Sequence, residues 1–330
     1  MSENASLGPN AQIRNEVIRR LYEAYFPGQE PVMVRPILQE QGWDERFFWQ
    51  TLDEMSIEGI IKCYSSGPQY IITPIGILHS EQRNLCPGDL AARNKRVRTR
   101  VLEKYADAYE EKGHHHGSHF HEIVRDVAAE TEVDEALVGA NHQFLFEAGQ
   151  LEHPGTLGFF MIAQVGLTAV REWRRRTSLL KDFEKLQESV KPQERGRDFQ
   201  GLFGELARGV GWSVEESVLG SGEEIDLVLH RENIFYLIEC RWKTDPVSTK
   251  EIRDFAGKLR KRSAVQGIFV SMSGYTGEAV KEVEGTTGDT PMVLVGPEEI
   301  CALFDEGLDF NELLAQKKRA LVMHRKAAWR

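Results

Sequence analysis

The chain has 330 residues, of which 41% are hydrophobic and 9% aromatic, so it is long enough for two or three domains with packed cores. Its net charge of −10 argues against a uniformly basic nucleic-acid binder. Basic residues nevertheless concentrate in the segments 93–104, 171–181, 253–262 and 317–330. These segments are either solvated helix faces or contacts to phosphates. No run approaches the ~18 apolar residues of a membrane span, and the N-terminus lacks a secretory signal. The four cysteines form no CxxC pair. We therefore expect a cytoplasmic protein that does not enter the membrane.

Two segments of the N-terminal half resemble each other at an offset of 90 residues. Tyr70–Leu78 (YIITPIGIL) aligns with Phe160–Thr168 (FMIAQVGLT), and each runs from an apolar strand through a glycine into a helix. Upstream, Glu54–Ile61 aligns with Phe144–Leu151 at the same offset. These similarities predict a duplicated unit of about 80 to 90 residues.

Each copy predicts three helices followed by a β-hairpin and a closing helix. The expected helices are 13–25, 32–41 and 44–58 in the first copy, and 98–112, 120–130 and 134–147 in the second. Asp44 and Asp134 stand where a helix N-cap belongs, and Gly59 and Gly149 stand where a C-cap belongs. The hairpins follow at 60–73 and 150–164. Both copies resemble winged helix-turn-helix domains, with module 1 at residues 10–84 and module 2 at 97–176.

A winged helix usually places its third helix in the DNA major groove, where Arg, Lys, Asn or Gln read the bases. Here the third helices start with acidic residues, DERFFWQ at 44–50 and TEVDEAL at 131–137, which phosphates would repel. Base reading by these helices therefore stays open beside three alternatives. The modules could bind a protein partner, dimerise, or touch DNA through the wings and the basic clusters.

The charged segment that ends in KPQERG predicts a helix that frays into a linker at residues 177–195, so the last domain spans 196–325. That domain is expected to begin with an amphipathic helix at 198–210, followed by strands at 212–218, 222–229 and 234–243. The third strand is apolar until it delivers Glu239, Arg241 and Lys243. Because strand side chains alternate, these three share one face.

A hairpin that brings Asp226 and Glu239 together suits one purpose above others. Two neighbouring carboxylates repel each other unless a positive charge lies between them. Mg²⁺ is typically held by one or two carboxylates together with water and phosphate oxygens, and a nearby Lys or Arg stabilises an anionic transition state. The alternative is a pair of surface acids that form ion pairs with Arg241 and Lys243.

Longer stretches of the last domain resemble a known family. RGRDFQGLF at 195–203, Ile225-Asp226 and IECRWK at 238–243 are similar to the Mrr-type restriction endonuclease domain of the PD-(D/E)xK superfamily. The segments at 246–261, 267–279 and 292–325 follow in the order that the family has. The resemblance implies an α/β restriction-endonuclease-like domain with a mixed central sheet flanked by helices. It also implies that Asp226 and Glu239 bind the metal.

Two positions depart from the family pattern. Arg241 stands where the family usually has a lysine, and arginine is a planar fork that does not give up a proton. Lys243, on the same strand face, could reach the site instead. Gln200 stands where the family often has an acid, and could orient a metal-bound water.

The whole sequence thus predicts a multidomain protein with two winged-helix modules and a type IV restriction-like endonuclease. It would hydrolyse DNA with Mg²⁺ or Mn²⁺ in defence against foreign DNA. A homodimer is expected because cutting both strands needs two sites. The alternative function is a catalytically degenerate nuclease fold that acts as a DNA-binding, adaptor or regulatory protein.

Overall fold

The computed structural model describes residues 8–65, 67–113, 117–189, 192–220, 223–285 and 291–327. Contacts between residues divide the chain into two units, Met1–Arg171 and Glu172–Arg330, and each unit has its own hydrophobic core. Within the described ranges, no helix is both long and apolar enough to cross a lipid bilayer.

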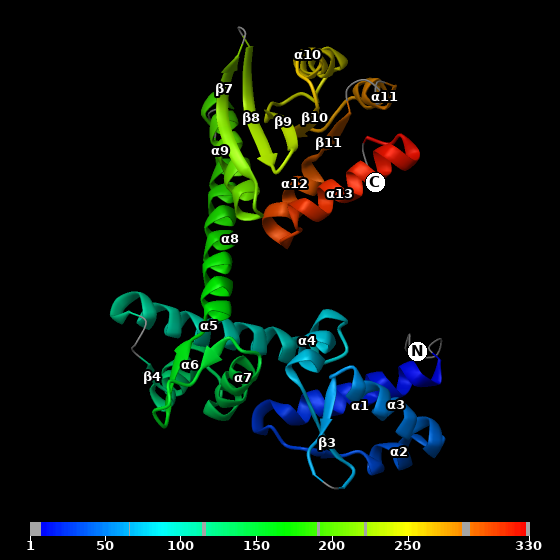
Figure 1. The fold of residues 1–330 in the computed structure, drawn as a ribbon, viewed down its shortest axis with the longest axis vertical. Coiled ribbons are helices and arrows are strands. Elements are labelled where there is room, and N and C mark those ends of the chain that lie inside the picture. The colour runs from blue at the N-terminus through cyan, green and yellow to red at the C-terminus, as the bar shows by residue number, and fades with distance from the viewer. Residues whose placement is uncertain are drawn as a thin grey trace. The chain divides into compact units, whose positions relative to one another are not determined.

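The N-terminal unit contains two successive sets of helices, each with a small antiparallel sheet (Figure 1). The first set comprises α1 (Pro9–Gly28), β1 (Val32–Met33), α2 (Arg35–Gln41), α3 (Glu45–Ile57), β2 (Ile61–Cys63), β3 (Gln69–Ile72) and α4 (Pro74–Gln82). The second comprises α5 (Gly88–Lys112), β4 (Ser118–His119), α6 (Phe120–Thr131), α7 (Glu135–Glu147), β5 (Leu151–Glu152), β6 (Phe159–Ile162) and the start of α8 (Gln164–Glu188). The helix predicted from residue 32 is wrong at its start, because Val32–Met33 form β1 and α2 begins at Arg35. The sequence also did not predict β4, and two-residue strands are too short to show an alternating pattern.

The helix ends of the two sets follow the same local chemistry. The side chains of Asp44 and Asp134 each accept a backbone N–H of the first turn of α3 and α7, as expected for N-caps. Gly59 and Gly149, which follow these helices, have φ angles of +73° and +70°. Glycine adopts this left-handed conformation without the steric cost that other residues incur. Asp44 and Asp134 are therefore confirmed as N-caps, whereas the C-cap residues are Glu58 and Ala148, and the two glycines lie one position beyond them.

A close backbone approach recurs at the start of the closing helices. A Cβ atom at Gly76 in α4 would collide with the carbonyl oxygen of Ile60, and one at Gly166 in α8 would collide with that of Gln150. Only glycine lets the helix lie this close to the end of α3 or α7. The same exclusion at equivalent positions supports the duplication inferred from the sequence.

A buried polar network joins the two sets inside one core. The hydroxyl of Tyr22 donates to Glu81 Oε1 at 2.7 Å, and Asn94 Nδ2 donates to the Tyr22 oxygen at 3.0 Å. Asn141 Nδ2 donates to Asn94 Oδ1 at 2.9 Å, and Arg98 forms an ion pair with Glu81. Because these residues come from both sets, the contacts group residues 1–171 as one unit, and the division into modules at 10–84 and 97–176 stays a prediction.

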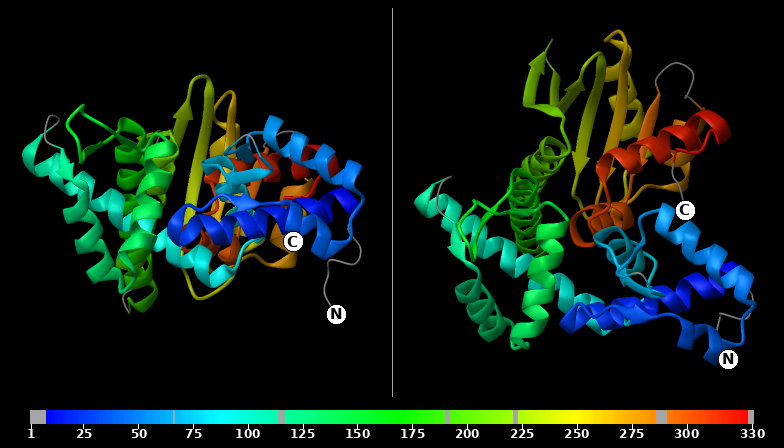
Figure 2. Two further views of the ribbon diagram at one scale, coloured as in Figure 1. Left: turned by 90° about the horizontal axis from the view of Figure 1, so that it is seen from below. Right: turned by 60° about the horizontal axis from the view of Figure 1, so that its bottom comes forward.

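The C-terminal unit is built on a five-stranded mixed sheet with the order β11-β10-β9-β8-β7. Its strands are β7 (Ser213–Gly220), β8 (Glu223–Arg231), β9 (Ile234–Arg241), β10 (Val265–Ser271) and β11 (Met292–Val295). The first three strands are antiparallel, whereas β9, β10 and β11 are parallel. Figure 2 (right) shows the strands side by side, from yellow-green β7 to orange β11. The mixed sheet expected from the sequence is confirmed.

Helices cover both faces of this sheet. They are α9 (Pro192–Gly209), α10 (Thr249–Arg260), α11 (Gly277–Gly285), α12 (Pro297–Cys301), the π-helical turn η2 (Ala302–Glu306) and α13 (Phe310–His324). On one face, α9 approaches Leu227 of β8, and α13 reaches Tyr236 of β9 through Lys318. On the other face, α10 reaches Glu239 of β9 through Lys258. The two faces of β9 are therefore in different surroundings, and the acidic face lies under α10.

The segment expected as a linker, 177–195, is largely helical. Residues up to Glu188 continue α8, and α9 begins at Pro192, while residues 190 and 191 lie outside the described residues. Leu179, Phe183 and Leu186 are buried in the core of the C-terminal unit. The charged residues of this segment occupy the exposed side of an amphipathic helix, which the sequence analysis interpreted as a frayed end.

Candidate active site

Asp226 and Glu239 lie opposite each other on neighbouring strands, as the sequence predicted. Leu227 of β8 pairs with Ile238 of β9 in an antiparallel register, so Asp226, one residue before Leu227, lies opposite Glu239, one residue after Ile238. Leu227 and Ile238 point into the core, and alternation turns the two carboxylates to the other face. The side chain of Asp226 is 18% exposed and that of Glu239 only 4%, so the acid pair is mostly removed from water.

Burial of the pair has an electrostatic cost. Burial raises the pKa of the Asp226 carboxyl, and the neighbouring Glu239 carboxylate raises the same pKa further. The backbone N–H of Cys240 donates to Asp226 Oδ2 at 2.8 Å and, like the charges of Arg241 and Lys258, opposes that shift. The site therefore holds concentrated negative charge that needs positive partners.

Arg241 bridges the two carboxylates. Its Nη1 lies 3.3 Å from Asp226 Oδ2, and its Nη2 donates to Glu239 Oε1. Nη1 also donates to the carbonyl oxygen of Cys240 at 2.9 Å. The Nε atom is buried and has no hydrogen-bond partner among the described residues. The guanidinium thus lies between the acids that the family resemblance assigns to a metal ion.

Lys258 of α10 is a second cation at the acid pair, and the sequence indicated it only as part of the basic segment 253–262. Its Nζ lies 2.8 Å from Glu239 Oε2 and 2.9 Å from the carbonyl oxygen of Glu224. A capping box formed by Ser248 and Glu251 fixes the start of α10. Seven residues, about two helical turns, separate Glu251 from Lys258, so both lie on one side of the helix. That spacing is the sequence signal that could have identified Lys258.

Lys243 does not contact the acid pair. Its Nζ lies 2.9 Å from Glu251 Oε1, and its side chain is 61% exposed. β9 ends at Arg241, so the alternation that would have kept Lys243 over the carboxylates ends two residues earlier. The same Glu251 oxygen lies 4.0 Å from Arg241 Nε, so Glu251 is a third acid at the edge of the site.

Gln200 of α9 contacts the backbone of the site rather than its carboxylates. Its Nε2 donates to the carbonyl oxygen of Asp226 and lies 3.4 Å from Ser217 Oγ. Ser217 has a φ of +49° and interrupts the pairing of β7 with β8 next to Asp226. Gln200 thus holds the main chain that carries Asp226.

The acid pair suits a hard divalent cation that takes only two ligands from the protein. Asp226 and Glu239 offer carboxylate oxygens, which Mg²⁺ and Mn²⁺ prefer, and water or phosphate would complete the shell. The described residues contain no group of three or more His, Cys, Asp or Glu side chains that could hold a metal by themselves. The guanidinium of Arg241 would have to yield one or both of its contacts to such an ion.

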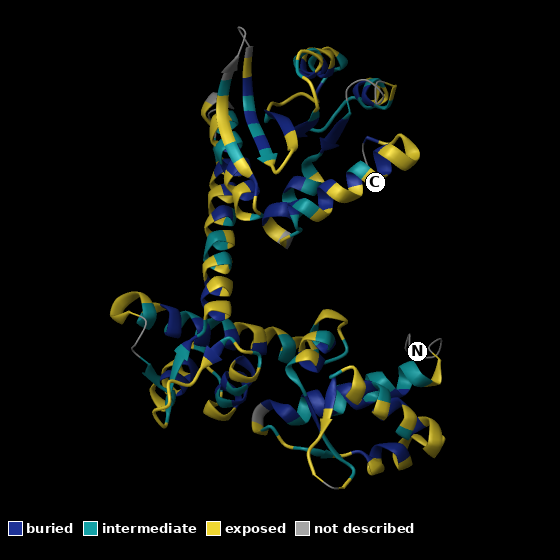
Figure 3. Ribbon diagram, viewed as in Figure 1, coloured by how far each residue is buried: buried dark blue, intermediate teal, exposed yellow. Residues whose placement is uncertain are grey.

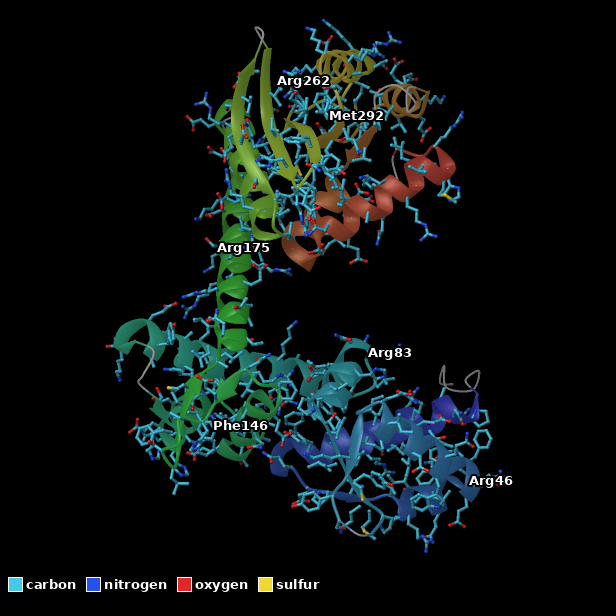
Figure 4. All side chains as sticks on the ribbon, in the orientation of Figure 1. Arg46, Arg83, Phe146, Arg175, Arg262 and Met292 are labelled. Atoms are coloured by element: carbon cyan, nitrogen blue, oxygen red, sulfur yellow. The ribbon has the colours of Figure 1, made fainter. Side chains whose placement is uncertain are left out.

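The surroundings of the site are folded tightly. β9 is dark blue in Figure 3 over its buried half, which ends at the site. Beyond the end of α10, the side chain of Arg262 donates from Nη1 to the carbonyl oxygen of Lys258 at 2.7 Å; Arg262 is labelled in Figure 4. The acids thus lie on β8 and β9, inside the sheet, and one of their cations comes from a capped helix.

Comparison with known proteins matches the C-terminal part of the chain to one family. Residues 193–304 match the family model Mrr_cat, a restriction endonuclease domain. No curated protein matches the chain.

Several solved structures show weaker likenesses. They include the protein of unknown function AF1548 (22% identity, TM-score 0.27) and the MspJI restriction endonuclease solved with a 27-mer oligonucleotide (19%, 0.26). A third is protein VC1899 from Vibrio cholerae (14%, 0.24). The matches cover 36%, 47% and 96% of this chain, and 65%, 36% and 83% of those proteins. The chain thus spans less than two thirds of the first two, and TM-scores this low do not indicate a shared overall fold.

Proposed function

We propose that the C-terminal unit, whose residues 193–304 match the restriction endonuclease domain, is a metal-dependent deoxyribonuclease of the PD-(D/E)xK superfamily. The observation that carries the proposal is the buried pair of Asp226 and Glu239 on adjacent strands of a mixed sheet. The family match supports a restriction role, and we propose that this role is defence of the type IV kind. Two copies of the chain in a homodimer would supply the two active sites needed to cut both DNA strands.

The reaction is hydrolysis of a DNA phosphodiester. The oxygen of a water molecule forms a new bond to phosphorus, and the bond from phosphorus to one sugar oxygen breaks. The water loses one proton, the departing sugar oxygen gains one, and the products are a phosphomonoester and a hydroxyl. A bound Mg²⁺ or Mn²⁺ supplies Lewis acidity and a more acidic water. Asp226 and Glu239 would hold that ion, and Gln200 fixes the backbone of Asp226.

The N-terminal unit is proposed to contain two winged-helix modules. Each set has the order helix, strand, helix, helix, strand, strand, and its last two strands form a hairpin that pairs with the first strand. This order supports the interpretation drawn from the sequence. It leaves open whether DNA or a protein is the ligand.

Side-chain burial argues against base reading by α7. Asn141 and His142 are fully buried, and burial lowers the pKa of His142 to about 4, so this imidazole is neutral at pH 7. A neutral, buried ring cannot attract phosphate. At α3, Arg46 is exposed near the helix start, beside the acidic Asp44 and Glu45 (Figure 4). DNA contact through exposed basic residues therefore fits this unit better than readout by its third helices.

The proposal is tested by incubating the full chain with supercoiled plasmid DNA and Mg²⁺ or Mn²⁺. We expect nicked or linear product, and chelation of the metal should stop its formation. Absence of cleavage with either metal would overturn the nuclease assignment. It would favour the second candidate, a DNA-binding or adaptor protein in which Arg241 takes the place of the metal between the acids.

Metal binding by the acid pair has its own expected result. At a metal concentration about a hundredfold above the dissociation constant, Mn²⁺ should stabilise the native chain by about 3 kcal/mol and raise its Tm by several degrees. Asp226→Asn should abolish the increase, because an amide oxygen carries no charge. Thermal unfolding with and without Mn²⁺ measures the shift. Asp245→Asn, at an exposed position of the same unit, is the matched control and should keep it. An equal shift in Asp226→Asn would place the metal elsewhere.

A further inference from the structure

We propose that Lys258, on helix α10, contacts the scissile phosphate and supplies the catalytic positive charge that β9 does not provide. This inference rests on the proposed nuclease function and names a residue for it. It assigns the role to a side chain that lies 19 positions beyond Glu239 in sequence and reaches the site across the sheet face.

The cations of β9 and its continuation are committed to other contacts. Arg241 directs both terminal nitrogens of its guanidinium to the acid pair and to the carbonyl oxygen of Cys240. Lys243 is paired with Glu251, outside the acid pair. Arginine also holds its donors in a fixed planar fork, and the fork of Arg241 faces the two carboxylates, so it could reach a phosphate only after a metal ion had displaced it from one of them.

Lys258 has the position and the N–H donors that contact with a phosphate requires. An ammonium group has three N–H donors, and two of those on Lys258 serve Glu239 Oε2 and the Glu224 carbonyl within the described part of the chain. The third remains for a phosphate oxygen. The side chain is 19% exposed, so its tip is within reach of a ligand that approaches the acid pair from solvent.

Helix α10 holds Lys258 firmly enough for catalysis. The capping box fixes the start of the helix, and Ile252, Phe255, Ala256 and Leu259 bury its other side in the core. Catalytic groups on rigid elements keep their geometry better than groups on loops. In the proposed step, the Lys258 ammonium faces a non-bridging phosphoryl oxygen and stabilises the charge that grows there as water attacks phosphorus. It transfers no proton and forms no covalent bond.

The effect of Lys258→Met separates a catalytic role from a positioning role. Methionine keeps the length and the apolar stem of the side chain but removes the charge. Loss of one preorganised charge at a transition state should lower the cleavage rate by about a hundredfold or more. Metal binding should persist or tighten, because Glu239 Oε2 loses a competing cation. If Lys258 only positions Glu239, its removal would weaken metal binding as well.

The experiment compares the native chain, Lys258→Met and Lys250→Met by plasmid cleavage and by the rise in Tm on adding Mn²⁺. Lys250 is an exposed residue of the same helix and controls for the loss of one charge. We expect Lys258→Met to lose cleavage and keep the Mn²⁺ shift, while Lys250→Met keeps both. Cleavage by Lys258→Met near the native rate would overturn this inference and leave the nuclease assignment intact. Loss of the Mn²⁺ shift in Lys258→Met would also overturn it, in favour of a positioning role. No cleavage by the native chain would overturn the nuclease function and this inference together.

Discussion

Glu239→Gln is expected to reduce plasmid cleavage by about a thousandfold. The substitution keeps the size of the side chain and removes the charge that the proposed metal ion needs. Metal catalysis contributes several kcal/mol to transition-state stabilisation, and about 4 kcal/mol corresponds to a thousandfold in rate. Because Glu239 also pairs with Arg241 and Lys258, its loss leaves two cations with fewer partners in the site.

The measurement is the initial rate of nicking of supercoiled plasmid at saturating Mn²⁺, with circular dichroism to show that the variant is folded. Glu232→Gln is the matched control, because Glu232 is an exposed residue of the same hairpin, in the turn between β8 and β9. The control should cleave at the native rate. A Glu239→Gln variant that is folded and cleaves within a few-fold of the native rate would refute the assignment of the acid pair.

Arg98→Ala is expected to lower the free energy of unfolding of the N-terminal unit by about 3 to 5 kcal/mol. Removing one partner of a buried ion pair leaves the other charge uncompensated, and that cost is typically of this size. The side chains of Arg98 and Glu81 are only 8% and 15% exposed. The guanidinium also lies 4.6 Å from the ring centre of Phe144 in α7, so the truncation removes packing within the second set of helices as well.

Urea unfolding monitored by circular dichroism measures this loss, and Arg93→Ala provides the control. Arg93 lies on the same helix α5, carries the same charge and is exposed, so its removal should change the stability by less than about 0.5 kcal/mol. A double variant, Arg98→Met with Glu81→Leu, should be less destabilised than the sum of the two single changes, because no charge then stays buried alone. Additive losses would mean that the pair does not act as a unit.

The buried contacts of the N-terminal unit give a physical reason for the loss of stability expected in Arg98→Ala. Tyr22, Glu81, Asn94, Arg98 and Asn141 form one chain of buried contacts between helices that belong to different repeats. In a low dielectric, removing one member of such a network leaves its neighbours without partners, which is costly. The two sets of helices therefore share one core.

The sequence by itself determined the local elements and the acid pair. The helices that follow Asp44 and Asp134 start there because each aspartate caps the first turn of its own helix. The alternation of side chains along β9 likewise depends only on residues that are neighbours in the sequence. The pairing of Asp226 with Glu239 followed as well, because the turn between β8 and β9 is short and fixes the register. In each case the interacting groups lie close together in the chain.

The tertiary structure decided which cations meet the acids and which residues join the repeats. Lys258 reaches Glu239 because α10 crosses the acidic face of the sheet, whereas Lys243, closer in sequence, turns to Glu251 once the strand has ended. The segment expected as a linker became helix because its apolar side found a core to cover. A short stretch of sequence determines helix caps and the alternation of side chains along a strand. Contacts between residues that are distant in the sequence depend on how whole helices and strands pack, which no short stretch specifies.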